Sequence, residues 1–161
     1  MHIWTIEKWK KYFDLSDSGL RSGLRLRFET GVDPEVKRAC QEFCKWLRRE
    51  YFFPVRVPIY VKAAEQIKAM DGDMVSGTCF LPYDRKEEPY IRVSAGDYYE
   101  MEKRRGQDNA LAAILMSIAH ELTHYFQWIN NLELTPIGEE RQASAYAGFI
   151  LDEYAETREH P

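Results

Sequence analysis

Apolar residues recur at helical spacing between residues 109 and 128. No glycine or proline interrupts this segment. Residues that are four apart lie on one face of a helix, and five such positions are apolar: Ala110, Ile114, Ile118, Leu122 and Phe126. Three further apolar residues widen this stripe: Leu111, Leu115 and Ala119. The pattern therefore predicts one long helix that is buried on most of its sides.

A second amphipathic pattern follows Asp33. Asp33 is a favoured N-cap residue, and proline is favoured at the first position of a helix, where Pro34 stands. The positions expected to face inward are Val36, Cys40, Phe43, Cys44 and Leu47. We expect a helix from Pro34 to about Tyr51.

The first 23 residues combine large apolar side chains with lysines. Residues 4 to 13 can form a short helix, and residues 14 to 23 read as a polar loop. We expect residues 1–23 to be an N-terminal arm that packs on the domain, rather than an arm that binds a partner or a membrane surface.

Short segments of alternating character predict the strands of a small sheet. They comprise residues 24–28, 55–61, 75–81 and 90–94. Pro58 argues against a central place for the second of them, because proline cannot donate to a β-ladder. Residues 64–70 are expected to form a helical turn. The predicted fold class is α+β, a single domain of residues 1–161 with a sheet of three or slightly more strands, antiparallel or mixed.

The composition of the chain bears on its size, its partners and its location in the cell. Its 161 residues are 45% hydrophobic, which suits one domain with a sizeable core, and its net charge of −4 gives no overall nucleic-acid footprint. We expect no direct nucleic-acid partner and no membrane span. Charged residues stand near the N-terminus where a signal peptide would be apolar, and the three cysteines read as reduced thiols. We therefore expect a cytoplasmic protein.

The segment His120-Glu121-Leu122-Thr123-His124 is an H-E-x-x-H motif on the long predicted helix. Two histidines four apart on a helix can reach one ion together, and zinc accepts such nitrogen ligands. Glu121 is then placed to act as general base on a water that the zinc polarises. The sequence thus predicts one Zn²⁺ per chain.

A catalytic zinc usually has a third protein ligand. Gln127 and Asn130 stand where the metzincin pattern has its glycine and third histidine, which excludes that class. A carboxylate from the next predicted helix is the other common solution, and the residues themselves leave Glu139 and Glu140 open.

The motif together with Glu140-Arg141-Gln142-Ala143-Ser144-Ala145-Tyr146-Ala147 resembles the gluzincin metalloproteases. It is most similar to the ImmA/IrrE family and the minimal gluzincins. The resemblance implies a zincin-like fold with an N-terminal helix, an active-site helix and a glutamate-ligand helix. It also implies that Glu140 is the third ligand. Relatives often carry Asp or Asn where this chain has Ser144.

The remaining site residues follow from this picture. Candidates for oxyanion stabilisation or for supporting a ligand are Tyr146, Ser144, Gln127, Tyr154 and His160. The strand before the motif helix, comprising Tyr90, Ile91, Arg92, Val93 and Ser94, is expected to offer a free edge to an extended substrate. The charged C-terminal tail, residues 156–161, is expected to be a frayed end, with an inhibitory plug in the cleft as the alternative.

We expect a zinc metalloendopeptidase that hydrolyses a protein or peptide substrate. The alternative is a zincin-fold regulatory or partner-binding protein with little or no turnover. A further alternative is a core helix that carries the motif by chance.

Overall fold

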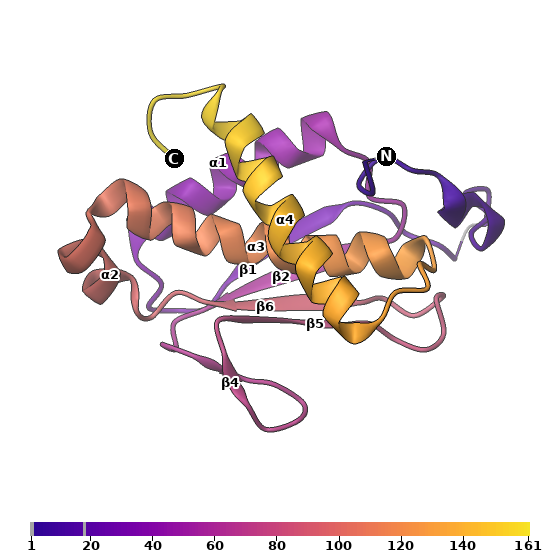
Figure 1. Ribbon diagram of the computed structural model, residues 1–161, viewed down its shortest axis with the longest axis horizontal. Coiled ribbons are helices and arrows are strands. Elements are labelled where there is room, and N and C mark those ends of the chain that lie inside the picture. The colour runs from indigo at the N-terminus through magenta and orange to yellow at the C-terminus, as the bar shows by residue number, and fades with distance from the viewer. Residues whose placement is uncertain (1, 18) are drawn as a thin grey trace.

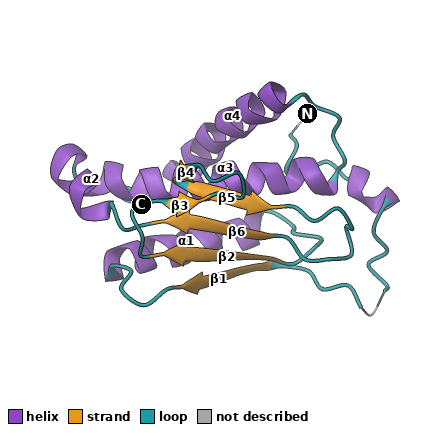
Figure 2. Cartoon of the chain, turned by 90° about the horizontal axis from the view of Figure 1, so that it is seen from below, coloured by secondary structure: helices purple, strands orange, loops and turns teal. Residues whose placement is uncertain are grey.

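The helices and strands form layers in the computed structural model, which describes residues 2–17 and 19–161 (Figure 1). A four-stranded sheet carries helices α1 (Pro34–Glu50) and α3 (Gln107–Ile129) on one face. Helix α4 (Pro136–Ala155) packs across α3, as Figure 2 shows from a second side. The chain is therefore α+β, as its sequence predicts.

The sheet is mixed, with the strand order β1-β2-β6-β5. Strands β1 (Leu24–Phe28), β2 (Val57–Lys62) and β6 (Tyr90–Ser94) run parallel to one another, and β5 (Gly77–Phe80) runs antiparallel to β6. Side chains alternate between the faces of a strand. The inward positions of β2 and β6 are fully buried beneath the helices.

The prediction that Pro58 keeps its strand out of the centre is wrong. β2 pairs with β1 on one side and with β6 on the other. Pro58 is the second residue of β2, and pairing with β6 starts only at Ile59. Proline is tolerated here because it stands at the start of the strand, before the second ladder begins.

The expected helical turn at residues 64–70 is also wrong. Here the chain forms a two-stranded antiparallel hairpin from β3 (Ile67–Lys68) and β4 (Met74–Val75). Gly72, with φ at +93°, lies in the turn between them, a conformation that glycine adopts readily. The strand expected at residues 75–81 is consequently divided at Ser76 into β4 and β5.

Local signals set the ends of the helices. The Asp33 side chain accepts a hydrogen bond from the N–H of Glu35 at 2.8 Å, which is the predicted N-cap of α1. Helix α2 (Tyr98–Arg105) was not anticipated, and Gly106 at φ +84° separates it from α3. No helix in residues 2–17 or 19–161 has both the length and the apolar character needed to cross a membrane.

The described part of the N-terminal arm packs on the domain, as expected, but it is not one helix. Its regular structure is a single 3₁₀ turn, η1 (Lys8–Lys11). Four apolar side chains of this segment are buried in the main core: Ile3, Trp4, Trp9 and Phe13. Three of the aromatic side chains, those of Trp4, Trp9 and Phe13, therefore pack within the chain.

Candidate metal centre

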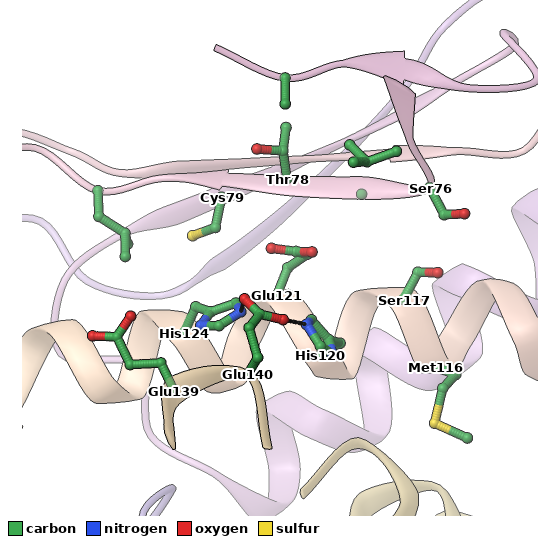
Figure 3. A pocket seen from close by; sticks show the side chains of 14 residues that line it. Ser76, Thr78, Cys79, Met116, Ser117, His120, Glu121, His124, Glu139 and Glu140 are labelled. Carbon is green, nitrogen blue, oxygen red and sulfur yellow. Dashed lines mark hydrogen bonds and ion pairs between the residues drawn. The ribbon is translucent and has the colours of Figure 1, made fainter. Parts of the chain in front are cut away.

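The middle of α3 presents the H-E-x-x-H motif to a cavity of about 570 Å³. His120, Glu121 and His124 line this cavity on the α3 side, and β5 lines it on the opposite side. Figure 3 shows the two imidazoles pointing toward the first turns of α4, while Glu121 points toward β5. The long buried helix predicted from the sequence thus holds all three motif residues on the wall of one cavity.

The two histidines and Glu140 converge on one point. Glu140 Oε2 lies 3.2 Å from His120 Nε2, and Glu140 Oε1 lies 3.1 Å from His124 Nε2. One ligand atom from each of the three residues lies within 4.8 Å of the others. Tetrahedral ligands about 2.0 Å from a zinc ion lie about 3.3 Å from one another. The two histidine–glutamate distances are close to this value, and the cluster has donor atoms that could hold one metal ion.

The start of α4 determines where Glu140 lies. The Thr135 hydroxyl accepts a hydrogen bond from the N–H of Gly138 at 3.0 Å, and Pro136 occupies the first turn. Ala143 and Ala147 are buried against α3, so the two helices approach closely. Close approach lets a glutamate on one helix reach histidines on the other.

Glu139 lines the same cavity, but its carboxylate points away from that of Glu140 (Figure 3). Its backbone carbonyl accepts a hydrogen bond from Gln127 Nε2 at 3.0 Å. The sequence did not decide which of the two glutamates lies beside the histidines. In the structure it is Glu140.

Gln127 connects α3 to α4. Its Oε1 lies 2.8 Å from His124 Nδ1, and its Nε2 donates to the carbonyl of Glu139 and to Gln142 Oε1, each at 3.0 Å. A hydrogen bond that His124 donates from Nδ1 leaves Nε2 free to bind a metal. Gln127 therefore contacts a histidine of the cluster, in the position expected for a residue that would support a metal ligand.

Glu121 is buried, with 8% of its surface exposed. Burial, followed by the nearby negative charge of Glu140, raises the pKa of Glu121 to about 8. Burial also lowers the pKa of His120, with the neighbouring His124 as the next cause. Both shifts follow from withdrawing charged groups from water, and a bound cation would favour the ionised form of Glu121.

Sequence reasoning missed Gly77, which faces Glu121 from β5. A Cβ atom at this position would lie 3.3 Å from both Cγ and Oε1 of Glu121 and 3.3 Å from a methyl carbon of Val93. A glycine inside a strand often marks such a close approach, and this was the available signal. Cys79, two residues on, points from β5 into the same cavity (Figure 3), and burial raises the pKa of its thiol.

The prediction that Tyr90–Ser94 offers a free edge is wrong. This strand, β6, is paired on both sides, with β2 and with β5. The free edge beside the cavity belongs to β5. This strand precedes β6 in the sequence, but it is the outermost strand of the sheet on that side. Chain order could not reveal this arrangement, because β5 returns antiparallel along the outer side of β6.

Two candidates on α4 lie outside the cavity. Tyr146 turns toward the N-terminal segment, and its hydroxyl accepts a hydrogen bond from the N–H of Ile3 at 3.2 Å. Ser144 is exposed and is not among the residues that line the cavity. Neither residue is placed to stabilise an oxyanion at the cluster, because each projects from a different side of α4.

The C-terminal candidates are also held elsewhere. Tyr154 is buried against Phe43, with ring centroids 4.9 Å apart, and His160 Nδ1 lies 2.7 Å from Asp108 at the start of α3. The carbonyl of Pro161 accepts a hydrogen bond from Arg38 of α1 at 3.1 Å. The tail therefore lies along α1 and the start of α3, and it does not plug the cavity.

Comparisons of the chain with protein-family models, with curated proteins and with solved structures find no significant match. The class of this protein can therefore be described only from its fold and its candidate site. This is an α+β protein whose His-His-Glu cluster could hold a metal ion beside a buried carboxyl group and an open strand edge.

Proposed function

We propose that the protein is a zinc-dependent metalloendopeptidase of the gluzincin type. The observation that carries the proposal is the convergence of His120, His124 and Glu140, with Glu121 beside them on the cavity wall. A structural zinc site is closed by four protein ligands, whereas a catalytic site has three and keeps one position open. The three-ligand cluster in an open cavity matches the catalytic arrangement.

The donor set favours zinc among the common metals. Two imidazole nitrogens and one carboxylate oxygen suit zinc, whereas magnesium and calcium prefer oxygen ligands alone. When bound, zinc supplies a Lewis acid that polarises water and the scissile carbonyl group. His120, His124 and Glu140 would hold it, and Gln127 would keep His124 in the tautomer that binds metal.

Glu121 would move the proton in the reaction. It would accept a proton from the attacking water as the new carbon–oxygen bond forms, and it would donate this proton to the amine as the carbon–nitrogen bond breaks. Its burial beside β5 keeps bulk water from competing for the proton, and Gly77 leaves room for its carboxyl group.

The free edge of β5 would bind the substrate backbone. Ser94 donates to the carbonyl of Ser76 at 2.8 Å, so the alternation of an antiparallel ladder directs the N–H groups of Gly77 and Cys79 away from β6. An extended peptide would add to this edge as another strand, between β5 and the cluster. This supports a protein or peptide substrate, and we propose a specific intracellular protein as the target.

Glu121→Gln tests the proposal directly. The variant preserves the size of the side chain but cannot accept the proton, so peptide cleavage should fall by at least about a hundredfold. Zinc content should stay at one ion per chain. A peptide library digested by the wild type provides the activity measurement, with His120→Ala as the variant that should lose both zinc and cleavage.

Wild-type protein that binds zinc but cleaves nothing, and whose biological activity survives Glu121→Gln, would contradict hydrolysis. That result would favour the alternative of a zincin-fold regulator without turnover.

A further inference from the structure

Residues 2–13 contact both helices that supply the metal cluster, and we call this segment the N-terminal strap. Among these contacts are hydrogen bonds from Ile3 N–H to Tyr146, from the Trp4 indole to Thr123, and from Trp9 N–H to Asn130. The first reaches α4, the second reaches α3, and the third reaches the residue that caps the C-terminal end of α3.

Trp4 makes the contact nearest to the motif. Its side chain is 2% exposed, and its ring stacks on Phe126 with a centroid separation of 4.9 Å. Its indole N–H donates to Thr123 Oγ1 at 3.1 Å. A buried indole N–H needs an acceptor, and Thr123, the residue just before His124, provides one inside the motif itself.

Thr123 also makes a hydrogen bond with the backbone of α3. Its hydroxyl donates to the carbonyl of Ala119 at 2.9 Å, one residue before His120. The Thr123 side chain is fully buried, so the two hydrogen bonds fix its position from both sides. The turn of α3 that carries both histidines is therefore tied to Trp4.

The neighbouring strap residues hold the other parts of the two helices. Ile3 N–H donates to the Tyr146 hydroxyl at 3.2 Å, six residues beyond Glu140 on α4. Trp9 N–H donates to Asn130 Oδ1 at 3.0 Å, at the C-terminal cap of α3. Two adjacent residues, Ile3 and Trp4, thus bind one ligand-bearing helix each.

This arrangement matters because the Glu140 side chain is 65% exposed. Its own packing does not fix its place, so its distance from the histidines depends on how α4 sits on α3. Metal sites tolerate errors in ligand distance of only about 0.2 Å. We propose that the N-terminal strap positions the metal cluster, with Trp4 as its main positioning residue. This proposal rests on the proposed zinc site.

The test measures zinc affinity by competition with a chromogenic chelator, alongside unfolding in urea. Trp4→Phe keeps an aromatic ring against Phe126 but removes the N–H donor. We expect zinc to bind about three- to tenfold more weakly, below the ten- to hundredfold typical when a direct partner of a ligand is lost. Trp46→Phe is the matched control, because Trp46 is 4% exposed in the α1 part of the same core. It should change stability without changing zinc affinity.

Substitutions at Thr123 test the same hydrogen bond by changing its acceptor. They remain informative if the Trp4→Phe protein fails to fold. Thr123→Val removes the acceptor at nearly constant shape and should weaken zinc binding to a similar extent. Thr123→Ser keeps the hydroxyl and should restore most of the affinity. The effects of Trp4→Phe and Thr123→Val should not add when combined, because both break one hydrogen bond.

The outcomes separate this inference from the proposed function. A wild type that binds no zinc overturns the metal site, and the role of the strap with it. A wild type that binds zinc, together with Trp4→Phe and Thr123→Val proteins of unchanged affinity, overturns the positioning role alone. Loss of affinity in Trp46→Phe equal to that in Trp4→Phe would also overturn it, because the effect would then follow general loosening of the core.

Discussion

Gln127 accepts a hydrogen bond from His124 at 2.8 Å, and its amide nitrogen donates a hydrogen bond to the backbone carbonyl of Glu139 at 3.0 Å. One buried side chain therefore orients a histidine of the cluster and fixes the residue next to Glu140. This relationship joins the two halves of the site across the contact between α3 and α4.

Gln127→Ala should weaken zinc binding by about ten- to hundredfold, because His124 loses the partner that sets its tautomer and orientation. Chelator competition measures this change. Gln41→Ala, an exposed substitution on α1, is the control and should bind zinc like the wild type. Equal affinity in the Gln127 and Gln41 variants would show that His124 does not depend on this contact.

Glu140→Ala should remove most of the bound zinc, whereas Glu139→Ala should retain about one ion per chain. The reason is geometric, since the Glu140 carboxylate faces both imidazoles and the Glu139 carboxylate points away from it. Elemental analysis of the purified proteins measures the difference. A loss of zinc in the Glu139 variant that matched the loss in the Glu140 variant would refute the assignment of the third ligand.

Gly77→Ala should reduce peptide cleavage while zinc content is retained. The added methyl group would press on the carboxyl group of Glu121 and on Val93, and such overpacking costs about 1–3 kcal/mol. The rate of cleavage and the zinc content are measured on the same preparation. A lower rate with unchanged zinc content would show that the substitution affects the general base and not the metal ligands.

Gly148→Ala is the control for this substitution. Nothing lies within 4 Å of a Cβ atom at Gly148, which is inside α4, so the change should raise stability by about 0.5–1 kcal/mol. Normal cleavage by Gly77→Ala would mean that the close approach of β5 does not constrain Glu121.

Metal-free wild-type protein should lose stability relative to Glu121→Gln as the pH rises from about 5 to 9. The folded protein holds the Glu121 proton with a pKa of about 8, whereas the unfolded chain releases it near 4.5. The unfolded chain therefore binds fewer protons between these values, and raising the pH favours unfolding. The two pKa values correspond to at most about 4–5 kcal/mol.

Urea unfolding of both proteins in the presence of a chelator, at pH 5 and at pH 8, measures this difference. Parallel pH profiles for the wild type and Glu121→Gln would show that the carboxyl group of Glu121 is hydrated in the folded protein. Zinc should reduce the effect in the wild type, because a nearby cation stabilises the carboxylate.

Much of the helical structure could be predicted because its signals are local. The Asp33-Pro34 start of α1 and the apolar stripe of α3 depend on residues within a few turns of one another. The His120–His124 pair followed from the same helical spacing. Glu139 and Glu140, by contrast, are adjacent in the chain, and periodicity could not choose between them.

The order of the strands could not be read from the chain. Pro58 in a central strand and β6 between two neighbours both result from pairing between segments far apart in the sequence. The hairpin of β3 and β4 was missed because two-residue strands carry almost no alternating pattern.

The sequence by itself determined the motif, the helix that carries it and the chemical types of the candidate metal ligands, because these depend on residue identity and on short-range periodicity. The tertiary structure decided which glutamate joins the histidines, which strand offers a free edge, and how Trp4 and Gln127 support the site. These features arise where segments distant in sequence pack together, and the positions of their side chains depend on helix crossing and strand order, which local patterns do not encode.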